Sequence, residues 1–191
     1  MVIQTESRLT TKISLLLVGL VVVSMADAGE VLKAKVTHQS GLYTPELDAR
    51  ITAPVPDVHR LLTAYNHLEQ VNPAVKESAI IETYSPAHHR VRSVIEACVA
   101  FFCKRLIQVW DVEQRSNGEI VAAIVPEVSN FRFGDAHWVL QEENGGTHLQ
   151  FTTRLEPAFW VPPLIGPWII RYKLHQEGLE SVENLERLAR F

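Results

Sequence analysis

The sequence predicts an α+β protein in which about seven antiparallel strands form a sheet and one long C-terminal helix lies across it. Two observations carry this prediction. Six segments with strand-like patterning follow one another, and turn signals such as Ser116-Asn117-Gly118 and Asn144-Gly145-Gly146 separate them. These segments are residues 76–84, 90–97, 104–113, 120–125, 134–142 and 148–156. Residues 164–191 then change to helical periodicity.

The elements before these strands are shorter. Residues 43–52 alternate loosely and predict a first strand with Leu47, Ala49 and Ile51 on one face. The Pro-rich stretch 53–57 ends that strand, and a short helix over 58–65 follows. A second helical turn over 67–71 ends before Asn72-Pro73. We expect residues 42–191 to form the domain and residues 29–41 to be a lead-in to it.

The C-terminal helix is amphipathic over its whole length. Pro167 fits the first turn, where its missing N–H costs nothing. The stripe expected to face the sheet is Leu164, Ile165, Trp168, Ile169, Tyr172, Leu179, Val182, Leu185, Leu188 and Ala189. The opposite face carries Lys173, Glu177, Glu180, Glu183 and Arg187. Gly178 lies among the apolar positions, where it either allows close approach, leaves room for a ligand, or is simply tolerated.

The first 28 residues have the features of a secretory signal peptide. Basic Arg8 and Lys12 precede the apolar run 13–23, and Ala26-Asp27-Ala28 matches an Ala-x-Ala cleavage site. The run is short for a membrane span, which needs about 20 residues. We therefore expect cleavage after Ala28 and export, into the periplasm of a bacterium. The alternative is a retained N-terminal membrane anchor.

Export changes the meaning of the two cysteines. Cys98 and Cys103 enclose four residues at the neck of a predicted hairpin, and exported proteins retain disulfides. A Cys98–Cys103 bridge is the expectation, and a pair of buried free thiols is the alternative. The sequence has no Cys-x-x-Cys motif and no second Cys/His pair at a zinc-binding spacing, so we expect no metal site.

Composition excludes several classes of protein. The chain has 191 residues, 47% of them hydrophobic and 21% charged, which is ordinary for a globular domain and unlike a disordered, collagen-like or multispan membrane protein. Its formal net charge is −4 and it has no basic run. A nucleic-acid partner is therefore not expected, because such binding depends on a field of Lys and Arg.

The order of elements resembles the helix-grip fold of the START-like superfamily, which includes polyketide cyclase-like and coenzyme Q-binding START-domain proteins. The resemblance covers about residues 42–190. It rests on the passages 51–58 and 61–65, on Leu68 and Asn72-Pro73, on 134–138 and 147–149, and on Pro162. It implies a curved antiparallel sheet wrapped around the long helix, with an apolar cavity between them. The implied guest is a hydrophobic small molecule, such as a lipid, an isoprenoid quinone or a polyketide-like aromatic compound.

Aromatic residues are concentrated in the last third of the chain and make up most of the candidate ligand-binding set. Any one of them could instead be an ordinary residue of the hydrophobic core. The set is Phe131, Trp138, Phe151, Phe159, Trp160, Leu164, Trp168 and Tyr172. The connection 156–168 is unusual, with two Trp, four Pro and Phe159. An apolar connection of this kind either folds back as a lid or touches a lipid or membrane surface, so we expect transient membrane contact through 159–168.

A catalytic role is the weaker reading. Asp135 and His137 share one face of their strand and could form an acid/base pair, but the other face is more apolar and is the expected core face. Arg92 and Glu96 also share one strand, and the sequence likewise does not decide whether they face the core or the solvent. No Ser-His-Asp order and no phosphate loop occur, so we expect no catalytic residue and no cofactor. Two alternatives stay open: a cyclase or hydratase acting on an aromatic or polyketide-like substrate, and an envelope protein-interaction module.

Overall fold

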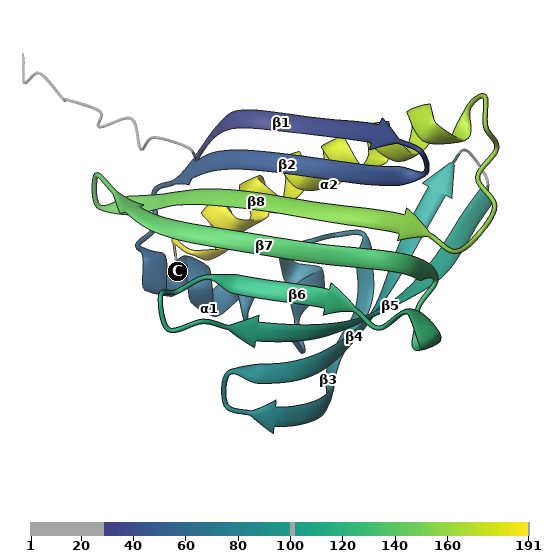
Figure 1. The fold of residues 1–191 in the computed structure, drawn as a ribbon. Coiled ribbons are helices and arrows are strands. Elements are labelled where there is room, and N and C mark those ends of the chain that lie inside the picture. The colour runs from purple at the N-terminus through teal and green to yellow at the C-terminus, as the bar shows by residue number, and fades with distance from the viewer. Residues whose placement is uncertain (1–28, 100–101, 191) are drawn as a thin grey trace, which may run out of the picture.

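One antiparallel sheet of eight strands and one long helix make up the architecture (Figure 1). The computed structural model describes residues 29–99 and 102–190, so the predicted signal peptide lies outside the described residues. The strand order is β1-β2-β8-β7-β6-β5-β4-β3. The strands are β1 (Glu30–Gln39), β2 (Leu42–Ile51), β3 (Val75–Ser85), β4 (His88–Val99), β5 (Phe102–Gln114), β6 (Ile120–Ile124), β7 (Phe131–Glu143) and β8 (Gly146–Pro157). The helices are α1 (Val55–Leu62) and α2 (Gly166–Leu188), with short 3₁₀ turns η1 (Leu68–Gln70) and η2 (Pro126–Val128).

The sheet curves around α2, as the helix-grip prediction required. In Figure 1 the helix α2 runs behind β1, β2 and β8, and it contacts β1 and β2 directly. The helix α1 contacts β7, β8 and α2, and so closes one end of the space between sheet and helix. Irregular register in the β1–β2, β3–β4 and β7–β8 pairs accompanies the bending of the sheet.

Residues 29–41, expected only as a lead-in to the domain, contain an eighth strand in addition to the seven predicted, the edge strand β1 over residues 30–39. The strand pairs antiparallel with β2 through a two-residue turn at Ser40-Gly41, both of which have positive φ (51° and 87°). Of the β1 side chains only Val36 is buried. Leu32, Ala34 and Val36 alternate with Lys33, Lys35 and Thr37, so the sequence does carry the pattern of a strand here and could have revealed it.

The other predicted elements are confirmed with small shifts at their ends. The helix α1 begins at Val55, because Pro54 takes the extended N-cap conformation and Pro56 is tolerated in the first turn. The second helical turn is the 3₁₀ turn η1. The helix α2 begins at Gly166 with Pro167 in its first turn, as expected.

The core occupies one end of the space between the sheet and α2. Its largest cluster joins α1, the C-terminal part of α2 and the sheet, and includes Ile51, Val58, Leu149 and Leu185. Each of these four side chains is almost completely buried. The N-terminal half of α2 lies beyond this cluster, and the candidate site is there. Among residues 29–99 and 102–190, no helix combines the length and the apolar character needed to span a membrane.

Candidate ligand cavity

A cavity of about 860 Å³ lies between the concave face of the sheet and α2. Most of its lining is apolar, and its volume falls within the roughly 300–1,000 Å³ of typical small-molecule sites. The walls come from all eight strands, the η1 region, the connection between β8 and α2, and the helix α2 itself. Such a space remains because the core fills only the α1 end, while the first turns of α2 rest on the edge strand β1, where Nε of Arg171 donates to the backbone carbonyl of Val36 at 3.2 Å.

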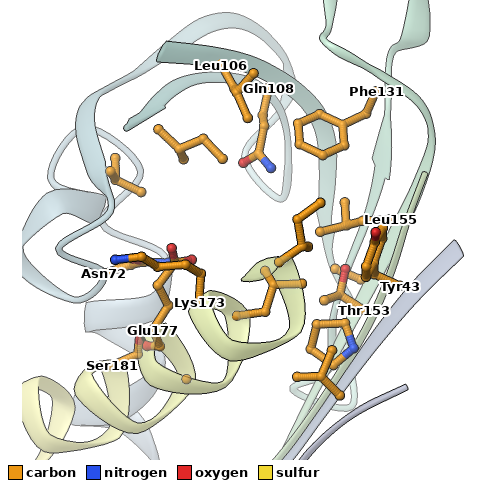
Figure 2. A pocket seen from close by; sticks show the side chains of 18 of the residues that line it. Tyr43, Asn72, Leu106, Gln108, Phe131, Thr153, Leu155, Lys173, Glu177 and Ser181 are labelled. Atoms are coloured by element: carbon orange, nitrogen blue, oxygen red, sulfur yellow. Dashed lines mark hydrogen bonds between the residues drawn. The ribbon is translucent and has the colours of Figure 1, made fainter. Parts of the chain in front are cut away.

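Strand alternation supplies the apolar wall of the cavity. Phe131, Leu155 and Leu106 reach into it from β7, β8 and β5 (Figure 2). The rings of Trp138 and Phe151 lie 4.8 Å apart between centroids and form a second aromatic patch. Aromatic groups of this size bury large apolar areas, so they provide most of the surface that a hydrophobic guest would contact.

Gly178 contributes to the cavity by lacking a side chain. A Cβ built at this position would have only one described neighbour outside the helix within 4 Å, the Cδ1 atom of Leu47 at 4.0 Å. Gly178 itself lines the cavity. Of the three readings left open by the sequence, the structure therefore excludes close approach to the sheet and agrees with room for a ligand.

Single polar groups interrupt the sheet side of the cavity. Ser93 and Gln108 line it, and Thr153 does so with its hydroxyl donating to the backbone carbonyl of Asp135 at 2.7 Å. The hydroxyl of Tyr65 is also buried against it. Burial raises the pKa of Tyr65 to about 12, although Gln114 opposes the shift, so this phenol stays protonated at neutral pH.

The helix side of the cavity is more polar than the sequence predicted. Lys173, Glu177 and Ser181 line it from α2, and Asn72 lies beside them from the segment after η1 (Figure 2). Burial raises the pKa of Glu177 to about 7, with Glu180 adding to the shift and Lys173 opposing it. The expectation that Lys173 and Glu177 lie on the solvent face is therefore wrong. The N-terminal half of α2 is rotated so that this polar row faces inward.

Five of the eight predicted ligand-binding residues line the cavity, and three do not. The five are Phe131, Trp138, Phe151, Phe159 and Trp160. Leu164, Trp168 and Tyr172 lie on the outside, with 94%, 69% and 53% of their surface exposed, so the expectation that they face the sheet is wrong. Trp168 stacks on Tyr172, and both line a shallow groove between α2 and β1. Inward space at this level is taken by Ile169 and Ile170 instead.

The charged pairs considered for catalysis lie on the outer face of the sheet. The carboxylate of Asp135 accepts a hydrogen bond from Nε of Arg154 at 2.9 Å. Nε2 of His137 is 3.3 Å from the carboxylate of Glu119. Arg92 and Glu96 pair with Glu77 and Arg105 in the same way. None of these four groups lines the cavity, in agreement with the prediction that Asp135 and His137 face solvent.

The two cysteines are directly opposite each other where β4 pairs with β5. The side chain of Cys98 lies outside the described residues, so the bridge itself stays a prediction. Cys103 and Lys104 line the rim of the cavity, and the ammonium group of Lys104 sits 4.1 Å from the centre of the Phe159 ring.

Several lining residues were missed because they are polar. Ser93 lies between Val91 and Ile95 on an inward-facing row, and Gln108 and Thr153 occupy equivalent positions in β5 and β8. The signal that could have revealed them is a polar residue within an otherwise apolar alternation. On α2 the signal is the four-residue spacing that brings a lysine, a glutamate and a serine onto the face of Gly178.

Solved structures show the same fold at low sequence identity. The Zhui aromatase/cyclase from Streptomyces sp. R1128 is 13% identical, with a TM-score of 0.65 over 78% of this chain and 94% of that one. A STAR-related lipid transfer protein from Xanthomonas axonopodis is 15% identical, with a TM-score of 0.60 over 86% and 100%. A START superfamily protein from Mycobacterium smegmatis is 18% identical, with a TM-score of 0.58 over 78% and 97%. No family model and no curated protein matches the sequence.

Proposed function

We propose that this chain, which has the helix-grip fold of START-like proteins, binds a hydrophobic small molecule in its cavity and shields it from water. The guest is a lipid or an isoprenoid quinone. The observation that carries the proposal is the 860 Å³ space with a mainly apolar lining between sheet and helix. Moving apolar surface out of water contributes about 25 cal/mol per Å², so a guest that fills this space gains most of its affinity from burial.

The connection between β8 and α2 is the proposed entry. Trp160 and Ile165 line the cavity and are also 78% and 60% exposed, so this connection forms part of the rim. Leu164, Trp168 and Tyr172 add exposed apolar surface beside it. Exposed apolar residues gathered at a cavity rim suit contact with a membrane, from which a lipid would be taken or to which it would be returned.

Export completes the proposal. A cleaved signal peptide over residues 1–28 would place the protein in the periplasm, and the cross-strand positions of Cys98 and Cys103 support a disulfide under those oxidising conditions. An exported carrier would meet its guest at the surface of an envelope membrane.

Solvent extraction of the purified protein, followed by mass spectrometry, tests the central proposal. We expect a lipid or quinone to be recovered in amounts close to one per protein, and an apolar fluorescent probe to compete with it. The matched control is Gly178→Phe, which places a ring inside the cavity from a position with free space around it. Loss of both signals in this variant is expected. No recovered guest and no probe binding by the native chain would contradict the proposal.

A cyclase-type enzyme is the second candidate, and one observation favours it. Glu177 lies in the cavity with a pKa of about 7, so it can both donate and accept a proton near neutral pH. Some proteins of this fold are aromatase/cyclases. If the cavity catalyses such a reaction, Glu177→Gln will abolish turnover of an aromatic polyketide-like substrate while retaining its binding. Asp135→Ala and His137→Ala, on the outer face, will leave turnover unchanged.

A further inference from the structure

A row of polar side chains crosses the cavity along α2. Lys173, Glu177 and Ser181 follow one another at four-residue intervals and therefore lie on one side of the helix. Asn72 approaches the same place from the segment before β3. Figure 2 shows the four side chains together on one side of the cavity, with Phe131 and Leu155 on the other. The cavity is thus amphipathic, with one polar end and an apolar remainder.

Two donor groups of this cluster, the ammonium group of Lys173 and the side-chain amide of Asn72, have no protein partner among the described residues. Within residues 29–99 and 102–190, no carboxylate lies within 4.0 Å of the Lys173 ammonium group. Oδ1 of Asn72 accepts a hydrogen bond from the backbone N–H of Ala74 at 2.9 Å, and this contact leaves the amide N–H groups to donate elsewhere. The hydroxyl of Ser181 donates to the backbone carbonyl of Glu177 and so only its lone pairs remain. The ammonium group of Lys173 and the amide of Asn72 therefore face the cavity unpaired, and a guest with acceptor oxygens at this end would pair with them.

We propose that Asn72, Lys173 and Glu177, at the polar end of the cavity, bind the carboxylate head of a single-chain amphiphile, whose apolar chain fills the rest of the cavity. This inference rests on the proposed function and names its ligand class. The ammonium group of Lys173 and the amide of Asn72 donate to the carboxylate. Protonated Glu177 adds a third donor, since a neutral carboxylic acid carries an O–H group.

Proton binding at Glu177 makes the affinity depend on pH. Burial holds its pKa at about 7, so above that pH an ionised Glu177 faces the ligand carboxylate and repels it. Lys173 and Glu180 are the charged groups that shift this pKa. The other titratable groups that line the cavity, from its various walls, are Lys35, Tyr43, Glu46, Tyr65, Lys104 and His175. Of these, Glu46 pairs with Lys33, and its carboxylate is therefore already satisfied.

Calorimetric titration with decanoate and with 1-decanol, at pH 6 and pH 8, tests this inference. The two probes share the chain and differ in the head. We expect the native protein to bind decanoate more tightly at pH 6 than at pH 8, and to bind decanol equally at both. Lys173→Met should weaken decanoate binding on the order of tenfold and leave decanol binding unchanged. Glu177→Gln should keep decanoate binding and remove its pH dependence. Arg187→Met, which removes a charge from the exposed end of the same helix, is the matched control and should change neither.

The outcomes separate this inference from the proposal on which it rests. Suppose that both probes bind but Lys173→Met weakens their binding equally, or that Glu177→Gln keeps the pH dependence. The proposed carboxylate site is then contradicted, whereas the proposal that the cavity binds a hydrophobic molecule is retained. If neither probe binds at either pH, while circular dichroism shows the chain folded, the proposed function and this inference are both overturned.

Discussion

The carboxylate of Glu186, near the end of α2, accepts a hydrogen bond from the backbone N–H of Thr52 at 2.8 Å. Thr52 follows directly after β2, and its hydroxyl donates to the same carboxylate. These two hydrogen bonds therefore fix the C-terminal end of α2 to the end of β2, at the place where the core lies. The cavity opens under the other half of the helix. One end of α2 thus holds the fold together and the other end covers the candidate site.

Glu186→Ala should destabilise the fold by about 2–3 kcal/mol, because two donors on Thr52 lose a buried charged acceptor. Burial acts to raise the pKa of Glu186, but the hydrogen bonds from Thr52 and Arg190 outweigh it and hold the pKa below its ordinary value. The stabilisation is therefore complete above the unfolded-state pKa of about 4.3 and is lost as the pH falls through the folded-state pKa. Urea unfolding at pH 7 and pH 3 measures both effects. An equal cost at the two pH values would contradict the assignment.

Glu177→Gln should have the opposite dependence on pH. The folded-state pKa of about 7 lies above the unfolded-state value, so the native protein loses stability as the pH rises between them. Replacing the carboxyl by a neutral amide should therefore stabilise the protein at pH 8, by up to about 3 kcal/mol, and have little effect at pH 4. Thermal unfolding at the two pH values gives the comparison. A variant no more stable than the native chain at pH 8 would show that Glu177 is well solvated.

Gly178→Ala should stabilise α2, by up to about 1 kcal/mol, because alanine has the higher helix propensity and its Cβ would meet only Leu47 at an ordinary contact distance. Ligand binding should change little, since a methyl group removes a small part of the cavity. Denaturant unfolding of the guest-free protein measures the gain. A loss of stability here would mean that the helix packs more closely on the sheet than the 4.0 Å contact indicates.

Trp160→Ser combined with Leu164→Ser should weaken adsorption to lipid vesicles without changing stability by more than about 0.5 kcal/mol, because both side chains are largely exposed. Vesicle flotation of the native and variant proteins measures the adsorption. Ile81→Ser, at an exposed apolar position on β3, is the matched control and should behave as the native chain does. Equal flotation of all three proteins would remove the proposed membrane contact.

Cys103→Ser should lower the stability of the oxidised protein by about 2 kcal/mol if the expected bridge to Cys98 forms, since the loop it closes is short. The mass of the intact chain after alkylation under denaturing, non-reducing conditions gives a direct readout. No added label is the expected result, and two added labels would show free thiols.

Local signals explain which elements could be predicted. The alternation in β2 and β7 and the turn at Asn144-Gly145 depend on neighbouring residues only, so they are visible in the sequence. The edge strand β1 was missed although Leu32, Ala34 and Val36 alternate with Lys33, Lys35 and Thr37, a local signal of the same kind. The same reasoning correctly placed Asp135 on the outer face, since a strand has two faces and the apolar one goes inward.

By itself, the sequence determined the meander of strands, the long C-terminal helix and most of the aromatic residues that line the cavity. These features depend on strand alternation, turn residues and helical periodicity, which are properties of short stretches of chain. Only the tertiary structure decided which side of α2 faces inward. Apolar residues occur on two sides of its first turns, Ile169 and Ile170 on one and Trp168 and Tyr172 on the other, so periodicity alone gives no unique face. The curvature of the sheet and the position of the core set the rotation. That rotation turned Lys173 and Glu177 inward and gave an otherwise apolar cavity its polar end.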